Sequence, residues 1–499
     1  MDVSEEETMP LVNSERAGSH KSSCDSAVTV QLYYCPTSKS ESTLSIPAGH
    51  VTAESICVLA AKNSGILPVF HHLFALASED LSFWYPPTHV FKSEENITVH
   101  YRVRFFFSSW FGEGSFKLSA TNNAVPVLKW SVLVLQSRSD FVSGRGGVNP
   151  PLGAMQECLG LAVLDLWRQA KERNRSPREV CKTVSYKSCL PKTHREDIQR
   201  MSRLARYQIR KTLKRFLQKL GQCSAGERSL KLKYLMELSA VEPNYGSERF
   251  TRWLQRSGTQ SVTVVRVSGE GGIQTRAEEG QTFCDFPQIT DISIKRVGQE
   301  QLPAEGRMVT LTRQDDRCLE VEFQTLAEAL SFVSLIDGYF RLTTDSSHYF
   351  CSEVAPPSLL QDLESHCHGP ITSEFAVHKL RKAGAQDGMF LLRRSPKEFD
   401  KYFLMVCLQT PLGVDYKDCL IEKNEKFHLA GIHSSFCSLR GLTDFYRQNT
   451  LLLSDIPVTL GKCCPPKAKG VVCLLNLLLL THCTKHLISY TITIKLSID

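Results

Sequence analysis

Apolar and polar side chains alternate with changing periods along this chain, and the changes divide it into segments. An alternating pattern typical of a half-buried strand begins with Val28, Val30, Leu32 and Tyr34. Residues 52–63 then carry apolar side chains at helical spacing, and residues 100–107 form another strand-like run. Strand, helix and strand in this order predict a small β-grasp unit over residues 26–110.

The next segment has the 3.6-residue period of amphipathic helices. One apolar stripe consists of Leu159, Ala162, Val163 and Leu166. A second stripe consists of Tyr234, Leu235 and Leu238. This pattern predicts an all-helical lobe within residues 111–260.

From Ser261 onward the period returns to two. Apolar pairs recur at residues 262 and 264, 292 and 294, and 309 and 311, each bounded by Gly, Pro or Asp turn signals. Residues 327–340 then have the pattern of a terminal helix. Several short strands capped by one helix are typical of a pleckstrin-homology-like (PH-like) β-sandwich, predicted here over residues 261–348.

The last segment follows a linker at residues 349–365 and combines a small sheet with two flanking helices. Its predicted elements run helix, three strands, short strand and helix, at residues 375–382, 389–394, 402–408, 419–421, 427–429 and 439–448. This order is typical of an SH2 domain, predicted over residues 366–462. We therefore expect a multidomain α+β protein. It consists of a FERM unit with ubiquitin-like, helical acyl-CoA-binding-protein-like and PH-like lobes, followed by the SH2 domain.

Composition and the chain ends add a cellular setting to this picture. Of the 499 residues, 42% are hydrophobic and 22% are charged, as in ordinary globular proteins. Residues 1–25 are polar and serine-rich, which predicts a disordered lead. This lead lacks the apolar core of a secretory signal, and Asp2 stands where myristoylation requires glycine. The 18 cysteines form no pair of CxxC motifs, so we expect reduced thiols and a cytoplasmic protein.

The sharpest local motif is the sequence FLLRRS at residues 390–395. It matches the phosphotyrosine strand of SH2 domains, in which a buried arginine clamps phosphate oxygens and a serine hydroxyl adds a hydrogen bond. By this match Arg393 is the clamp and Ser395 is its helper. The competing interpretation is a surface strand that ends in two solvated arginines, which the preceding HGPI sequence at residues 368–371 disfavours.

The rest of this predicted pocket departs from the SH2 pattern. Ser373 and Glu374 stand where the first helix usually supplies a second arginine, and Asp418 aligns where the central strand usually offers a histidine. A carboxylate that faces a dianionic phosphate opposes its binding. We therefore expect the SH2 domain to contribute to partner binding without requiring phosphate.

A second candidate site is a basic stretch at residues 195–219, predicted to be one amphipathic helix. Its candidate binding residues are Arg200, Arg203, Arg206, Arg210, Lys211, Lys214 and Arg215. Such a face can contact an anionic membrane or an acidic segment of a partner, or it can be solvated without any partner. Nucleic acid is the least favoured of these alternatives.

Signatures of catalysis are missing from the sequence. A protein kinase needs a Gly-rich loop over the phosphates, a strand lysine, and HRD and DFG elements, and none of these occurs. The Gly-rich residues 268–272 lie between two predicted strands, which indicates a hairpin turn. Histidines and cysteines lack metal-ligand spacing, so we expect no metal site and no cofactor.

Several longer stretches resemble the Janus kinase family of non-receptor tyrosine kinases. They are SGILPVF at residues 64–70, WYPP at 84–87, KTVSYK at 182–187, CDFP at 284–287 and SLIDGYFRLTTD at 334–345. The resemblance covers residues 27–469 and is strongest with the lymphoid branch of the family. It implies one receptor-binding body that grips the membrane-proximal cytoplasmic tail of a cytokine receptor.

The resemblance also implies partners and a location. The lymphoid branch is associated with the common gamma chain of interleukin receptors and with JAK-STAT signalling, at the inner face of the plasma membrane or an endomembrane. A tyrosine kinase in the sense of the whole family, and a membrane-cytoskeleton FERM linker, remain as alternative functions.

Two regions depart from the family. The match weakens at residues 115–135, where the apolar run from Trp130 to Val134 replaces a more mixed helix. After Lys469 the family continues into a pseudokinase and a kinase, whereas residues 471–480 here begin an apolar tail. At about 1.5 Å per residue, ten residues fall short of a bilayer core of about 30 Å. We expect residues 463–499 to be an aberrant or alternative C-terminus.

Overall fold

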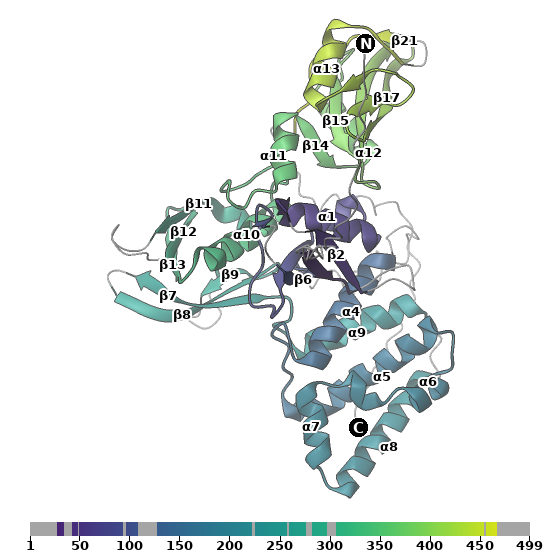
Figure 1. Ribbon diagram of the computed structural model, residues 1–499, viewed down its shortest axis with the longest axis vertical. Helices are drawn as coiled ribbons and strands as arrows, with labels where there is room; N and C mark the ends of the chain where they lie inside the picture. Colours follow the sequence, from purple (N-terminus) through teal and green to yellow (C-terminus); the bar gives the residue numbers. More distant parts are fainter. Residues whose placement is uncertain are drawn as a thin grey trace, which may run out of the picture.

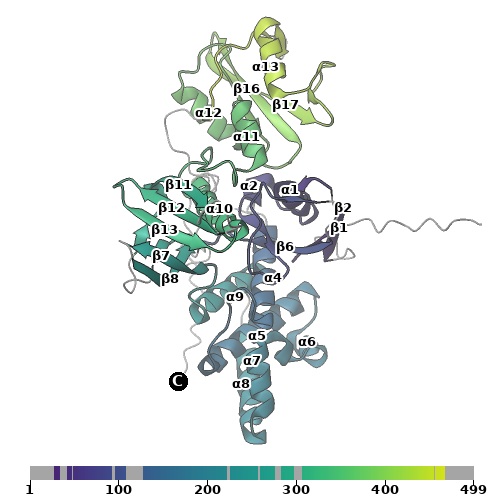
Figure 2. The ribbon, with the colours of Figure 1, turned by 60° about the vertical axis from the view of Figure 1, so that its left-hand side comes forward.

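The computed structural model describes residues 27–33, 42–47, 49–92, 96–107, 127–221, 225–256, 259–275, 282–296, 306–453 and 456–466. The predicted disordered lead, and the predicted tail beyond residue 466, lie outside the described residues. Figure 1 shows an elongated molecule with a helical lobe at one end and a small α+β domain at the other. Two sheet-containing lobes lie side by side between them (Figures 1 and 2).

The first lobe is a four-stranded sheet with the strand order β2-β1-β6-β4. Its strands are β1 (Ala27–Gln31), β2 (Thr43–Pro47), β4 (Phe74–Ser78) and β6 (Ile97–Val103), and a two-stranded pair is formed by β3 (Val51–Thr52) and β5 (Val90–Phe91). β1 and β6 are parallel. Helix α1 (Ala53–Asn63) packs against β4, with the Thr52 hydroxyl accepting from the Ser55 amide as its N-cap, and α2 (Pro68–His71) follows. The predicted β-grasp is confirmed.

The second lobe is all helical. It contains α4 (Val127–Ser143), α5 (Met155–Glu172), α6 (Pro177–Thr183), α7 (Lys192–Arg200), α8 (Arg203–Gly221) and α9 (Glu227–Val241), with short turns η2 (Leu152–Ala154) and η3 (Tyr186–Cys189). Helix α5 lies in its centre and packs against α6, α8 and α9. Within the apolar run near Trp130, Val132, Leu133 and Val134 are buried, so this run is part of the core helix α4.

The third lobe is a seven-stranded antiparallel sheet closed by one helix. Its strands are β7 (Glu248–Arg256), β8 (Thr259–Ser268), β9 (Gly272–Thr275), β10 (Thr282–Cys284), β11 (Ile289–Arg296), β12 (Arg307–Arg313) and β13 (Cys318–Phe323), in the order β10-β9-β8-β7-β13-β12-β11. The turn η4 (Phe286–Gln288) precedes β11, and α10 (Leu326–Thr343) packs against β12 and β13.

Two details of this lobe bear on the sequence predictions. The Gly-rich residues 268–272 are the predicted hairpin turn, between β8 and β9. Gly272 has φ +59°, and a Cβ there would lie 2.4 Å from the Cys284 carbonyl oxygen, so both conformation and space require glycine. The sheet already begins with β7 at residue 248, so the predicted lobe boundary at residue 260 is too late.

The fourth unit is a six-stranded sheet between two helices. It comprises β14 (Cys367–Pro370), α12 (Ser373–Lys382), β15 (Phe390–Arg394), β16 (Lys401–Thr410), β17 (Gly413–Lys423), β18 (Phe427–Leu429), β19 (Ser435–Phe436) and α13 (Leu439–Gln448), followed by the hairpin of β20 (Leu451–Leu453) and β21 (Ile456–Val458). The predicted order is confirmed, with β17 much longer than expected. The Cys464 amide bonds to the Phe390 carbonyl at 2.8 Å, so this sheet extends past the boundary predicted at residue 462.

The two faces of this sheet have different neighbours. Leu391 and Met405 share a core with Leu380 of α12, whereas Leu392 and Leu404 share one with Leu442 of α13. Since side chains alternate along a strand, consecutive residues of β15 point to opposite faces.

Direct contacts join the first lobe to the last domain. Helix α11 (Pro357–Glu364) lies in the predicted linker, and the Ser358 amide and hydroxyl both donate to the Glu54 carboxylate of α1, the amide at 2.8 Å. Lys62 Nζ lies 2.6 Å from an oxygen of Asp400. One of these contacts reaches the linker and the other reaches the last domain. Together they hold the first lobe and the last domain against each other.

Candidate functional site

Arg393 lies at the floor of the pocket predicted from the FLLRRS motif. It is the fourth residue of β15, it faces α12, and its side chain is 3% exposed. Its Nη1 donates to the Ile371 carbonyl at 3.0 Å, and its guanidinium lies 4.3 Å from the centre of the Phe403 ring. The burial predicted for the clamp arginine is therefore present, which excludes the alternative of a solvated strand end.

The carboxylate of Asp418 occupies the remaining outer nitrogen of this guanidinium. Asp418 lies on β17, opposite Met405 in the register, and forms an ion pair with Nη2 of Arg393. It also accepts a hydrogen bond of 3.1 Å from the Ser373 hydroxyl. Burial lowers the pKa of Arg393, and the charge of Asp418 opposes that effect. The alignment of Asp418 with the pocket is confirmed.

Ser395, the predicted helper, is also buried, but the structure gives its oxygen other partners. The Ser395 Oγ accepts hydrogen bonds of 3.2 Å from the backbone amides of Lys397 and Glu398. These bonds shape the turn that leads from β15 into β16. The serine therefore fixes the loop beside the arginine, and its role toward a phosphate stays a prediction.

A second carboxylate lies at the start of α12. Hydrogen bonds from the Glu374 backbone and from Thr372 lower the pKa of Glu374, and the charge of Arg393 contributes less. Glu374 is therefore ionised at neutral pH, in the place where a second arginine was predicted to be missing. Two acidic side chains and one buried arginine thus surround the pocket.

The basic stretch is two helices rather than one. Helix α7 ends at Arg200, Met201 has extended backbone angles, and the Ser202 hydroxyl accepts from the Ala205 amide as α8 begins. The turn between them lies at the end of the helical lobe furthest from the SH2-like unit (Figures 1 and 2). Of the seven candidates only Arg200 belongs to α7, and the other six lie on α8.

The surface of α8 is strongly basic. Its nineteen residues include seven Lys or Arg and no Asp or Glu. Its exposed cations are Arg203, Arg210, Lys211, Lys214, Arg215 and Lys219, while Arg206 is half-buried. Within the part of the chain that the structure describes, none of the seven candidates forms an ion pair with an acidic side chain. Leu204 and Tyr207 are 70% and 62% exposed on the same helix.

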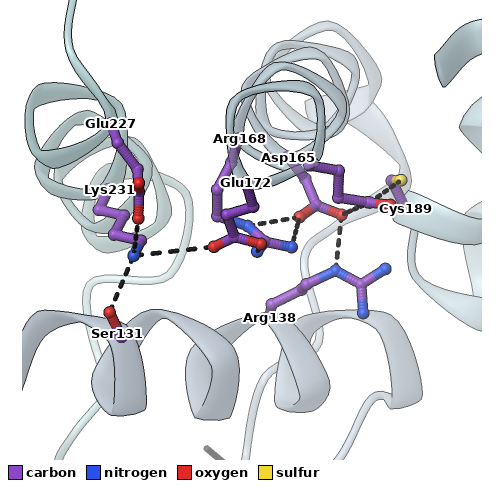
Figure 3. A network of polar contacts seen from close by, with 9 residues as sticks. Ser131, Arg138, Asp165, Arg168, Glu172, Cys189, Glu227 and Lys231 are labelled. Atoms are coloured by element: carbon purple, nitrogen blue, oxygen red, sulfur yellow. Dashed lines mark hydrogen bonds and ion pairs between the residues drawn. The ribbon is translucent and has the colours of Figure 1, made fainter. Parts of the chain in front are cut away.

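A network of charges inside the helical lobe, buried at Asp165, Arg168 and Lys231, was not predicted from the sequence (Figure 3). Asp165 of α5 accepts from Arg138 of α4 at 2.6 Å and from Arg168 at 2.7 Å. The guanidinium of Arg168 also contacts Glu172 at 2.5 Å. The sequence carries a partial signal for it, because Asp165, Arg168 and Glu172 have the i,i+3 and i,i+4 spacing of ion pairs within one helix. Their burial and their contacts with other helices leave no local signal.

The other half of the network is centred on Lys231 of α9, whose side chain is 3% exposed (Figure 3). Its Nζ donates to the Ser131 hydroxyl of α4 at 2.8 Å and lies 3.7 Å from Glu172 of α5. It also pairs with Glu227 one turn earlier on α9. The network therefore links α4, α5 and α9.

A cavity of about 430 Å³ lies where the first lobe, α10, the linker and the last domain meet. Three of its lining residues are His71, His72 and His368. Burial lowers the pKa of all three, to about 4 for His71 and for His368, with Arg394 and Lys379 adding to the effect respectively. Among the described residues no group of three or more His, Cys, Asp or Glu side chains is arranged to hold a metal ion. The described helices also include none that is long and apolar enough to cross a bilayer.

Comparison with known families assigns each of the four units. Residues 28–120 match the FERM F1 ubiquitin-like domain, and residues 124–241 match the FERM F2 acyl-CoA binding protein-like domain. Residues 263–348 match the Jak1 pleckstrin homology-like domain, and residues 365–466 match the SH2 domain. The predicted architecture, a FERM unit followed by an SH2 domain, is confirmed.

Similarity to curated proteins extends across the units. The chain is 43% identical over 438 residues to tyrosine-protein kinase JAK3 of Rattus norvegicus, which covers 85% of this chain and 40% of the relative. It is 31% identical over 514 residues to tyrosine-protein kinase JAK1 of Danio rerio, covering 86% of the chain and 44% of the relative. The chain belongs to the Janus kinase family. It spans about two fifths of the length of these Janus kinase relatives.

Solved structures that align with the chain include FERM proteins from outside the Janus kinases. The complex of the FERM and C-terminal domains of Drosophila Merlin aligns with 12% identity and a TM-score of 0.43, covering 64% of this chain and 96% of that one. The MyTH4-FERM MF2 domain of Dictyostelium discoideum myosin VII aligns with 14% identity and a TM-score of 0.42, covering 63% and 58%.

Proposed function

We propose that this chain is the receptor-docking and regulatory module of a Janus-type signalling protein. It binds the membrane-proximal cytoplasmic tail of a cytokine receptor, of the common gamma chain type, and so takes part in JAK-STAT signalling. The observation that carries this proposal is the joining of FERM and SH2 units through Glu54, Ser358, Lys62 and Asp400. A continuous body of this kind offers one extended surface to a receptor segment.

A direct binding experiment tests the docking function. The full chain is titrated against an immobilised membrane-proximal tail of a common gamma chain type receptor, with a scrambled tail of the same composition as the control. We expect saturable binding to the native order alone. Equal binding to both tails, or to neither, contradicts the proposal.

A competition experiment extends the test into cells. Two ligands for one site displace each other by mass action. Expressed beside a complete Janus kinase, the chain should therefore lower cytokine-stimulated receptor phosphorylation as its own level rises. Unchanged phosphorylation at large excess contradicts docking at the same site.

Kinase activity is the alternative that the relatives' names raise. Transfer of labelled phosphate from ATP to a tyrosine peptide by the purified chain measures it directly, and we expect none, because the sequence contains no HRD or DFG element. Phosphate transfer would favour the enzyme over the docking module.

We also propose that the chain is cytoplasmic and lies at the inner face of the plasma membrane or an endomembrane, and the exposed basic surface of α8 supports this peripheral position. Basic residues near an anionic membrane contribute about 1 kcal/mol each, and salt screens them within about 10 Å at 0.1 M. The cations of α8, which form no ion pair with any described residue, meet this requirement, and the exposed Leu204 and Tyr207 add apolar contact area.

Charge reversal tests the membrane contact. Replacing Arg206, Arg210 and Lys214 by glutamate should abolish salt-sensitive binding to vesicles that contain anionic lipid. The matched control replaces the exposed Lys171, Arg173 and Arg175 beside the end of α5, which gives the same charge change in the same lobe. Equal binding of the native chain to neutral and anionic vesicles would show that α8 is merely solvated.

A further inference from the structure

The SH2 pocket contains a carboxylate in the place that a phosphate would need. Arg393 has two outer guanidinium nitrogens for a bidentate ligand, and the structure assigns Nη1 to the Ile371 carbonyl and Nη2 to Asp418. The inner Nε has no partner within the described part of the chain and is buried. Each outer nitrogen therefore already has a partner, and a phosphate that binds Arg393 bidentately must compete with Asp418 for Nη2.

The register of the sheet places Asp418 next to Arg393. Arg393 lies opposite Phe403, and Phe403 lies opposite Leu420, so the three adjacent strands are in register at this point. Asp418 is two residues from Leu420 and therefore projects from the same face of β17. The carboxylate reaches the guanidinium across Phe403, against which the guanidinium is stacked.

Asp418 is also held from a second side. The Ser373 hydroxyl at the start of α12 donates to the same oxygen that faces Arg393, and the Asp418 side chain is only 26% exposed. To leave the pocket, this side chain must give up both the ion pair and the hydrogen bond. Ser373 thus supports the carboxylate at the position where a second arginine would have attracted phosphate.

The charges around the pocket point the same way. A phosphotyrosine brings about 1.5 to 2 negative charges at neutral pH. It would meet the ionised Glu374 as well as Asp418, with Arg393 already neutralised by its partner. Like charges at such short range oppose binding.

We propose that Asp418 is an internal ligand of the SH2 pocket, which occupies Arg393 in place of phosphotyrosine and so determines that the domain does not bind phosphorylated peptides. This inference deepens the docking function proposed above and rests on it for the biological ligand. The pocket itself remains a latent phosphotyrosine site, because the buried arginine and the loop at Ser395 are in place.

Removal of the charge at Asp418 is the test. Asp418→Asn keeps the size of the side chain and an oxygen that can accept from the Ser373 hydroxyl, and it removes the negative charge that neutralises Arg393. The full chain is titrated with a generic phosphotyrosine peptide and with its unphosphorylated form. We expect the variant to bind the phosphorylated form about tenfold or more tightly than the native chain does, which corresponds to about 1.4 kcal/mol of relieved competition.

Two further variants make the result specific. Asp415→Asn changes the same charge on the same strand, but Asp415 pairs with Lys417 at 3.1 Å and its side chain is 49% exposed, so it should leave phosphopeptide binding unchanged. The double variant Arg393→Ala, Asp418→Asn should lose the gain. If Asp418→Asn does not fold, as judged by thermal melting, Asp418→Ser removes the charge with a smaller side chain and should give the same gain.

The outcomes separate this inference from the docking function. Equal phosphopeptide binding by the native chain, Asp418→Asn and Asp415→Asn would overturn the role of Asp418. Tight, phosphate-dependent binding by the native chain would overturn it as well. Binding of the unphosphorylated receptor tail is measured in parallel, and its absence from the native chain counts against docking alone.

Discussion

Two buried arginine–carboxylate clusters in this molecule differ in how completely they are satisfied. In the helical lobe, Asp165 is contacted by two arginines and by the amide of Gln169, from two helices (Figure 3). In the SH2 pocket, Arg393 has one carboxylate and an unpaired Nε, and that carboxylate is partly exposed. A buried charge that is fully paired fixes packing, whereas one with a single exchangeable partner leaves room for a ligand.

The largest effect on the free energy of unfolding is expected from breaking the Asp165 cluster of the helical lobe. Asp165→Asn removes the charge that the buried Arg168 and the half-buried Arg138 share, and removal of one partner from a buried pair costs about 3–5 kcal/mol. We expect a loss of unfolding free energy of this size in chemical denaturation. Glu157→Gln, an exposed change on the same helix, is the control and should stay within about 0.5 kcal/mol. A small effect of Asp165→Asn would mean that the cluster contributes little to packing.

Acid should destabilise the junction between the FERM and SH2 units more than it destabilises the Asp165 cluster of the helical lobe. The pKa of His368 is lowered to about 4 by burial and by Lys379, so the folded state resists a proton that the unfolded chain accepts below about 6.5. Stability contributed by such a group is present above pH 6.5 and is lost as the pH falls toward 4. At pH 5 the loss amounts to about 2 kcal/mol for each histidine of this kind, and His71 is another.

The ion pairs of the Asp165 cluster should remain formed at pH 5. Burial alone would raise the pKa of Asp165, but the charges of Arg168 and Arg138 outweigh it and the pKa is lowered. Asp165 therefore remains ionised at pH 5. Hydrogen exchange at pH 7 and pH 5, corrected for the intrinsic rate, should show lost protection near His368 and retained protection in α5. Equal loss in both regions would contradict the assignment.

The smallest effect on the free energy of unfolding is expected from breaking the ion pair between Arg393 and Asp418 in the SH2 pocket. Arg393→Ala leaves Asp418 next to solvent, so we expect a cost of about 1.5 kcal/mol, the scale of one hydrogen bond to a charged group. Affinity for an unphosphorylated receptor tail should be nearly unchanged. A cost near that of Asp165→Asn, or a clear loss of tail affinity, would show that the pocket arginine has a structural or direct binding role instead.

The sequence predicted those features that depend on local periodicity and on motifs. Alternation located β1 and β12, helical spacing located α10, and FLLRRS located Arg393 at the pocket floor. The alignment of Asp418 was predicted as well. Its ion pair was not, because the pairing depends on the register of β15, β16 and β17.

Other features could not be predicted because they depend on tertiary packing. The charges of Asp165 and Lys231 are buried only because three helices meet around them. The break between α7 and α8 contains no Gly or Pro, and its one local signal is Ser202 as an N-cap. The exposure of Leu204 follows from that break, since a continuous helix would have placed its apolar stripe against the core.

The two adjacent arginines of β15 constrain the number of residues in this strand as well as their identity. Arg393 faces the pocket, while Arg394 faces the other side, where its Nε lies 2.7 Å from Asp362 of the linker helix. Because a strand has a period of two, a one-codon insertion or deletion within β15 exchanges the two sides. We therefore expect natural variants of this strand to carry substitutions more often than insertions or deletions.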